Sequence, residues 1–119
     1  LGVPQDYKMA FKWYAKSAEQ GYVNAQWNLG GMYVFGRGVP QNNIIAAKWL
    51  TSAAEQGLAD AQSYLALMYG LGRGVPQDYI KAYMWSNIAL KSNENFKMRD
   101  WANTNIKKFE KKMTPEQIT

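Results

Sequence analysis

The sequence of 119 residues contains no cysteine and no histidine. Without cysteine no disulfide can form. The absence of both residue types also removes the thiolate and imidazole groups of most metal sites and the usual base of nucleophilic triads. No run of about 18 apolar residues occurs, so we expect no membrane-spanning helix. These absences argue against the commonest metal sites and nucleophilic triads, and we assign no catalytic, metal-binding or cofactor-binding residue.

The composition is nevertheless that of a folded protein. Apolar residues make up 47% of the chain and charged residues 19%, which is typical of a domain with a core rather than of a disordered tail. The formal net charge is +5, and the positive excess is greatest near the end. Residues 91–119 hold seven basic and four acidic side chains, against seven and five in residues 1–90.

An internal repeat dominates the sequence. The segment Gly-Val-Pro-Gln at residues 2–5 recurs at residues 38–41 and 74–77, with a spacing of 36 residues each time. Residues 2–37 match residues 38–73 at 18 of 36 positions, and the third copy keeps the pattern as far as Trp85 before it diverges. A period of about 20–50 residues indicates stacked units, each of which buries its apolar face only against its neighbours.

Each copy predicts two α-helices and no strand. In the first copy, Ala10, Trp13, Tyr14 and Ala18 follow the i, i+3, i+4, i+8 spacing of one apolar helix face. Gly21 then suits the left-handed position that ends such a helix. Six helices are expected in all, near residues 6–20, 24–35, 42–56, 60–71, 78–92 and 94–113.

Short polar residues stand at the expected start of each helix in the repeats. Such side chains accept hydrogen bonds from the unpaired N–H groups of the first helical turn. We therefore expect N-caps at Asp6, Asn24, Asn42, Asp60 and Asp78.

Recurring large and small residues predict how the repeats pack. Trp13, Trp49 and Trp85 occupy one register position at an apolar phase, and we expect all three to be buried between helices. Gly30 and its counterpart Ala66 are small residues that would let neighbouring helices approach closely.

The shared motifs are Ala-x-x-Trp-Tyr/Leu-x-x-Ser/Ala-Ala-Glu-Gln-Gly, Ala-Gln-x-x-Leu-Gly/Ala-x-Met-Tyr and Gly-x-Gly-Val-Pro-Gln. They resemble those of the SEL-one-like repeat (SLR) family, a relative of the tetratricopeptide repeat, over residues 2–93. The resemblance implies an all-α fold, a right-handed α/α superhelix (solenoid) of 36-residue helix-turn-helix repeats with a concave inner surface. It also implies a scaffold or adaptor rather than a catalyst, and a fragment of a bacterial protein.

The end of the chain departs from the repeat. We assign residues 1–93 to the repeat array and residues 94–119 to a C-terminal capping helix followed by the start of a truncated helix, with Thr114 and Gln117 forming a capping box. A basic cluster lies here, at Lys107, Lys108, Lys111 and Lys112. We interpret it as the solvated outer face of the capping helix, because an acidic residue interrupts it and the earlier repeats have no basic match.

The candidate binding surface consists of positions that differ between repeats while the framework stays constant. By analogy with tetratricopeptide-like arrays, the helices at residues 24–35 and 60–71 line the concave face. Aromatic residues there either anchor a partner, as Trp and Tyr often do, or contact the neighbouring repeat, and both interpretations stay open. The candidate partner-binding residues are Asn24, Trp27, Asn28, Gly31, Phe35, Asp60, Ser63, Tyr64, Leu67 and Leu71.

These observations predict a monomeric scaffold that binds a protein or peptide on its concave face, without binding nucleic acid. Two alternatives stay open. The first is a regulatory or targeting array of a larger enzyme. The second is a glycan-binding array, which would need exposed aromatic residues paired with carboxylates in one groove. We assign no compartment: the bacterial cytoplasm, the periplasm and secretion all fit, because Leu1 lies inside the repeat pattern and a targeting segment can precede it.

Overall fold

The structure, a computed structural model, describes residues 4–92, 96–114 and 117. These residues form six α-helices and no strand, so the predicted all-α fold is confirmed. The helices are α1 (Pro4–Glu19), α2 (Val23–Phe35), α3 (Asn43–Glu55), α4 (Ala59–Leu71), α5 (Tyr79–Ser92) and α6 (Phe96–Glu110).

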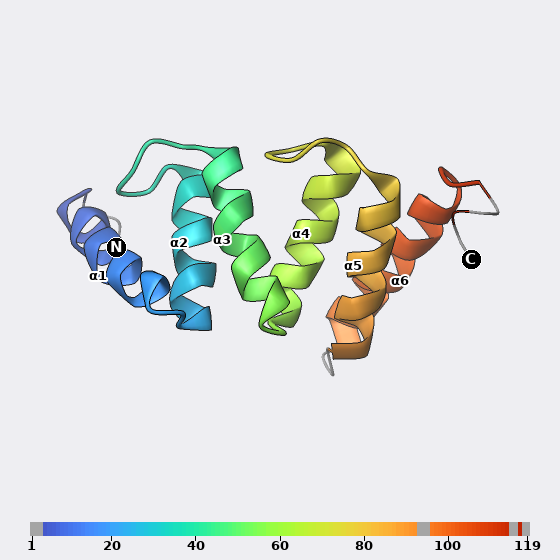
Figure 1. Cartoon of the computed structure of the whole chain (residues 1–119), viewed down its shortest axis with the longest axis horizontal. Helices are drawn as coiled ribbons and strands as arrows, with labels where there is room; N and C mark the ends of the chain where they lie inside the picture. Colours follow the sequence, from blue (N-terminus) through green and yellow to red (C-terminus); the bar gives the residue numbers. More distant parts are fainter. Residues whose placement is uncertain (1–3, 93–95, 115–116, 118–119) are drawn as a thin grey trace.

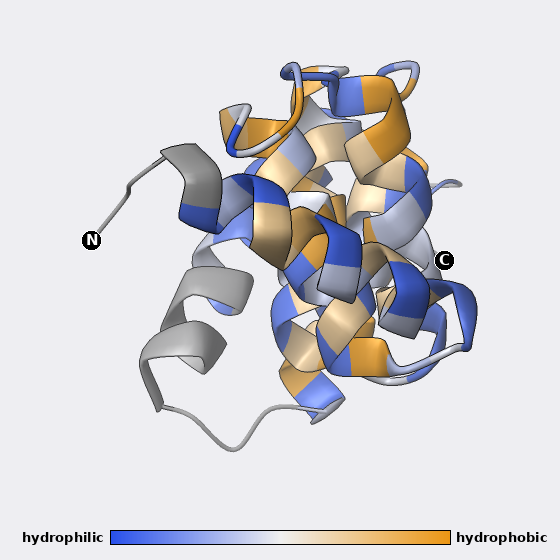
Figure 2. Cartoon of the chain, turned by 90° about the vertical axis from the view of Figure 1, so that its left-hand side faces the viewer, coloured by the Kyte–Doolittle hydropathy of each residue, from blue (hydrophilic) through white to orange (hydrophobic). Residues whose placement is uncertain are grey.

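The helices are stacked in chain order along the length of the molecule, which measures 50 × 28 × 26 Å (Figure 1). Each helix packs chiefly against the helix before it and the helix after it in the sequence. Figure 2, seen from the α1 end, shows hydrophilic and hydrophobic residues alternating within single helices. This pattern is expected of helices that bury one face and expose the other.

The first helices of the second and third pairs begin as predicted. The Asn42 carboxamide oxygen accepts a hydrogen bond from the Ile45 N–H at 3.0 Å, and the Asp78 carboxylate accepts one from the Lys81 N–H at 3.0 Å. The predicted N-cap at Asp6 is wrong, because α1 already begins at Pro4. Proline is favoured in the first helical turn, where its missing N–H leaves no hydrogen bond unmade.

The predicted N-caps Asn24 and Asp60 are also wrong, because α2 and α4 begin before these residues. The reason is the tight turn that joins the helices of each pair. Gly21, at a φ of 93°, donates its N–H to the Ala18 carbonyl at 3.0 Å, and the next N–H donates to the carbonyl five residues before it at 3.2 Å. This Schellman motif ends α1 and leaves no spare residue before α2.

Small residues set the spacing between helix pairs, as predicted. A Cβ atom on Gly30 would lie 2.8 Å from Cδ2 of Leu50, a side chain that is fully buried. At the next interface the same register positions hold Ala66 and Ser86, both buried. A larger residue on one helix is therefore matched by a smaller one on the other.

A polar link also joins the first two repeats. The Gln56 amide donates to the Gly21 carbonyl at 3.0 Å and to the Gln26 side-chain oxygen at 2.7 Å. In the next repeat Ser92 stands at the register of Gln56. The side-chain oxygen of Gln62, the counterpart of Gln26, is buried there with no hydrogen-bond partner among the described residues. The link therefore belongs to the first interface alone.

The three register-matched tryptophans differ in burial. Trp49 and Trp85 are half-buried, and each packs on buried alanine and leucine residues of the preceding helix pair. Trp13 is 68% exposed, so its predicted burial is wrong. The described part of the chain holds no helix pair ahead of α1, and the surface that covers the other two indoles has no counterpart there.

α6 packs against α5, and its side chains Ile106 and Phe109 are buried, as is Met113 just beyond the end of the helix. It is shorter than the predicted span of 94–113, and residues 93–95 lie outside the described part of the chain. Beyond it, the Thr114 N–H donates to the Gln117 side-chain oxygen at 2.9 Å. This bond is one half of the predicted capping box.

Two adjacent glycines of α2 should respond in opposite ways to alanine. Gly30→Ala places a methyl group against Leu50 and should lower the free energy of unfolding by about 1–2 kcal/mol, as overpacking does. Gly31→Ala meets no atom within 4 Å and should raise it by about 0.5–1 kcal/mol through helix propensity. Urea denaturation of the two variants measures both changes, and equal effects would contradict this account of the interface.

The tryptophans provide a second comparison at one register position. Trp49→Ala should lower the free energy of unfolding by about 2–4 kcal/mol, somewhat below the usual range for a fully buried aromatic residue, because the indole is half-buried. Trp13→Ala should change it by less than about 0.5 kcal/mol, as exposed substitutions do. Thermal and urea denaturation test the pair; a large loss for Trp13→Ala would show that this indole supports α1 despite its exposure.

Candidate binding site

Two pockets lie on the two flanks of one face of α4. Tyr64, Leu67 and Leu71 follow one another at i, i+3 and i+7, so they share that face. Tyr64 lines a pocket formed with α2, whereas Leu67 and Leu71 line a pocket formed with α6. The two pockets are therefore neighbours along one face of the stack, and together we call them the groove.

The first, which we call the Trp27 pocket, has a volume of about 250 Å³ and no charged residue in its lining. The rings of Trp27 and Tyr64 meet edge to face, with 6.5 Å between centroids and 77° between planes, a favoured geometry for aromatic pairs. Phe35 is 65% exposed at its margin. The lining residues are Trp27, Gly31, Val34, Phe35, Leu50 and Tyr64.

Trp27 and Tyr64 also contact the neighbouring repeat. Both are half-buried, and both pack against a buried cluster formed by Ala47, Leu50 and Met68. The sequence left open whether these rings face a partner or the adjacent repeat. In the structure they join the repeats and form a wall of the pocket at the same time.

A single cation stands beside the Trp27 pocket among the described residues. The guanidinium carbon of Arg37 lies 5.1 Å from the ring centroid of Phe35 and 5.7 Å from that of Tyr7. Both distances are within the range of a cation–π contact. The charge of Arg37 is therefore held by two aromatic rings and does not line the pocket itself.

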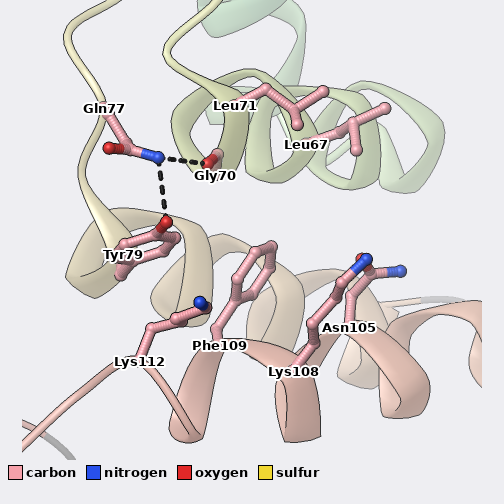
Figure 3. A pocket seen from close by; sticks show the side chains of 9 residues that line it. All are labelled: Leu67, Gly70, Leu71, Gln77, Tyr79, Asn105, Lys108, Phe109 and Lys112. Atoms are coloured by element: carbon pink, nitrogen blue, oxygen red, sulfur yellow. Dashed lines mark hydrogen bonds between the residues drawn. The ribbon is translucent and has the colours of Figure 1, made fainter.

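The second, which we call the Phe109 pocket, has a volume of about 230 Å³. Figure 3 shows the Phe109 ring between two lysines, with leucine side chains of α4 across from it. The Gln77 amide donates to the Gly70 carbonyl at 3.0 Å and to the Tyr79 hydroxyl at 2.9 Å. These two hydrogen bonds hold together the wall of the pocket that the three residues form. The lining residues are Leu67, Gly70, Leu71, Gln77, Tyr79, Asn105, Lys108, Phe109 and Lys112.

Gly70 is the residue that lets α6 form this pocket. A Cβ atom at Gly70 would lie 2.6 Å from Cε1 of Phe109, so the ring occupies the space that a side chain would take. The same register position in the first repeat holds Val34, which lines the Trp27 pocket with its own side chain. Exchanging valine for glycine therefore admits a ring from α6.

The basic cluster divides between two surfaces. Lys108, in the last turn of α6, and Lys112, in the turn after it, line the Phe109 pocket, whereas Lys107 and Lys111 line neither pocket of the groove. All four are exposed. The expected solvent exposure of the cluster is thus confirmed, but Lys108 and Lys112 also line a pocket, because they lie on either side of Phe109 (Figure 3).

The structure brings most of the candidate residues together. Six line the groove, while Asn24, Asn28 and Asp60 are exposed but line neither pocket, and the Asn28 amide donates to the Asn24 carbonyl at 2.9 Å. Contrary to the expected surface position, Ser63 is 3% exposed, because a small side chain at this register lies within the packing between helices. The six are Trp27, Gly31, Phe35, Tyr64, Leu67 and Leu71.

Gln77, Tyr79 and Phe109 were not among the candidates. Gln77 lies in the loop between α4 and α5, and Tyr79 is the first residue of α5. Phe109 lies on a helix that no longer matches the repeat, so register between copies could not place it. A signal did exist in Gly70, where the loss of a side chain indicates that another group approaches closely.

The described residues show no arrangement typical of a catalytic metal site. No group of three or more acidic side chains among them is placed to hold a metal ion. None of the described helices has the length and apolar character needed to cross a membrane. What the groove offers is apolar and aromatic surface with amide and ammonium groups at one end.

The Sel1 repeat family matches residues 1–22, 23–58 and 59–93. Among solved structures, a protective antigen present in uropathogenic Escherichia coli strains, which displays an SLR fold, is 38% identical with a TM-score of 0.89, over 99% of this chain and 24% of that one. A Sel1 repeat protein from Oxalobacter formigenes is 34% identical with a TM-score of 0.76, over 83% of this chain and 39% of that one. No curated protein matches. The chain thus spans less than half the length of either solved relative, and with three matched repeats it belongs to the Sel1 repeat family.

Proposed function

We propose that the chain is a non-enzymatic scaffold that binds a segment of a partner protein, or a peptide, along the groove. Membership of the Sel1 repeat family supports a role in protein interaction, which is general for such repeats. The observation that carries the proposal is the Trp27 pocket. It is a hollow with aromatic and aliphatic walls and no charged lining residue, next to a largely exposed Phe35.

The size and lining of the groove favour a side chain over a free small molecule. Each pocket has a volume of about 230–250 Å³, below the range of about 300–1,000 Å³ typical of small-molecule and cofactor sites. Two such hollows in a row, separated by exposed or half-buried leucines of α4, suit successive side chains of one peptide. Large aromatic walls bury much apolar area at little entropic cost, which is why they recur at interfaces.

The groove gives less support to a glycan ligand. Sugar recognition by aromatic stacking also needs carboxylates beside the exposed rings in the same groove. None of the described residues that line either pocket is acidic. A peptide with apolar side chains therefore fits the Trp27 pocket better than a sugar does.

Gly31→Leu tests the proposal without disturbing the core. Leucine already stands at this register in the next repeat, as Leu67, and a Cβ atom on Gly31 meets no atom within 4 Å. The substitution should leave the fold intact but fill the Trp27 pocket. Peptides selected from a random library on the unmodified chain should carry large apolar side chains and should bind Gly31→Leu at least about tenfold more weakly, as loss of an anchor contact does.

Asn28→Ala is the matched control, since Asn28 is exposed on the same helix and lines neither pocket. Its effect on the dissociation constant should be less than about twofold. Titration calorimetry or fluorescence anisotropy gives both values. Failure of the library to yield any specific peptide, or equal weakening by the two variants, would refute the groove as the binding surface.

A further inference from the structure

The two pockets of the groove differ in charge. Among the described residues, none that lines the Trp27 pocket is charged, and Arg37 beside it is held over the rings of Phe35 and Tyr7. The Phe109 pocket has the same kind of apolar floor but two ammonium groups, Lys108 and Lys112, in its lining. The groove is therefore apolar at one end and apolar with positive charge at the other.

The two ammonium groups are available to a ligand. Both lysines are exposed, and within the part of the chain that the structure describes neither ammonium group has an ion-pair or hydrogen-bond partner. None of the described residues that line the pocket is acidic, and Glu110, between the two in sequence, is not part of the lining. Figure 3 shows the two lysines on either side of the Phe109 ring, so an apolar contact and a charge contact are offered side by side.

From this arrangement we infer that the Phe109 pocket takes an apolar side chain of a partner segment whose neighbouring residues include aspartate or glutamate. This inference rests on the proposed function and adds the chemistry and the direction of the bound segment. The apolar side chain occupies the space beside Leu67, Leu71 and Phe109, and the carboxylate lies between Lys108 and Lys112. A segment with its purely apolar end in the Trp27 pocket and its acidic end here would be bound in one direction.

Charge complementarity is the reason for choosing an acidic peptide as the occupant. The chain carries a formal charge of +5 with the excess in its last quarter, which draws anionic segments toward this end of the groove. A nucleic acid would also be attracted by lysines, but its phosphates need no apolar hollow and would use Lys107 and Lys111 equally. The pairing of ammonium groups with an apolar floor favours a peptide.

Two double variants with the same change in net charge provide the experiment. Lys108→Gln with Lys112→Gln neutralises the pocket, and Lys107→Gln with Lys111→Gln neutralises the remaining two lysines of the cluster. The probes are peptides selected from a random library on the unmodified chain, together with copies in which Asp and Glu are replaced by Asn and Gln. We expect the selected peptides to be enriched in acidic residues next to apolar ones.

The variant Lys108→Gln with Lys112→Gln should bind the acidic peptides about 5- to 30-fold more weakly, as expected from the loss of two partly exposed ion pairs. The variant Lys107→Gln with Lys111→Gln should bind them less than about twofold more weakly. The amide copies should bind the unmodified chain and the Lys108 and Lys112 double variant almost equally, which a purely structural role of the lysines would not produce. Far-ultraviolet circular dichroism and urea denaturation verify that both variants fold.

Equal weakening by the two double variants, or selected peptides without acidic residues, would overturn the inference. An oligonucleotide that binds more tightly than any peptide, with an affinity that falls steeply between about 50 and 200 mM salt, would also overturn it and assign the cluster to nucleic acid. In each of these cases the proposed function is judged separately, by whether Gly31→Leu weakens peptide binding. If peptides bind Gly31→Leu more weakly but bind the Lys108 and Lys112 double variant equally well, the proposed function is supported. Only the inference that the Phe109 pocket takes an acidic segment is then refuted.

Discussion

The close approach of helices at positions with little or no side chain is the constraint on which the rest of the structure depends. Gly30 lets the fully buried Leu50 lie against the backbone of α2. In the same way, Gly70 lets the ring of Phe109, on α6, lie against the backbone of α4. Each helix pair is too small to bury its own apolar face, so its stability comes from the neighbour that it contacts. A methyl group at either glycine would push apart two elements that hold each other in place.

The groove is a consequence of the same packing. Leu29 and Leu65 are fixed in the core, whereas the residues two and six positions after them on α2 and α4 lie outside it and differ between the repeats. In the first repeat these positions hold Gly31 and the exposed Phe35, and in the second they hold Leu67 and Leu71. The frame thus repeats while the lining of the groove changes from one repeat to the next.

Much of this architecture could be predicted from the sequence, and the failures have physical causes. The six helices could be predicted from the spacing of apolar residues and from the glycines, such as Gly21, that end helices. Both signals depend only on residues that are close together in the sequence. The capping role of Asn24 was mispredicted because the turn geometry, and not a polar side chain, decides where α2 begins. The exposure of Trp13 depends on what lies beside α1, and the repeat pattern does not predict this, because equal positions in two copies need not have the same neighbours. The Phe109 pocket escaped prediction because the helix that carries it has no counterpart in the earlier copies.

α6 therefore does more than stack on α5. The exchange of Val34 in one repeat for Gly70 in the next would leave a hole at the interface if α6 simply continued the pattern. Instead Phe109 fills that hole, and because Lys108 and Lys112 flank Phe109 on the same side of the helix, the packing of the ring carries two positive charges to the edge of an apolar hollow. The position of these charges is fixed by a buried contact rather than by exposed side chains. This is why two of four neighbouring lysines belong to the groove and the other two do not.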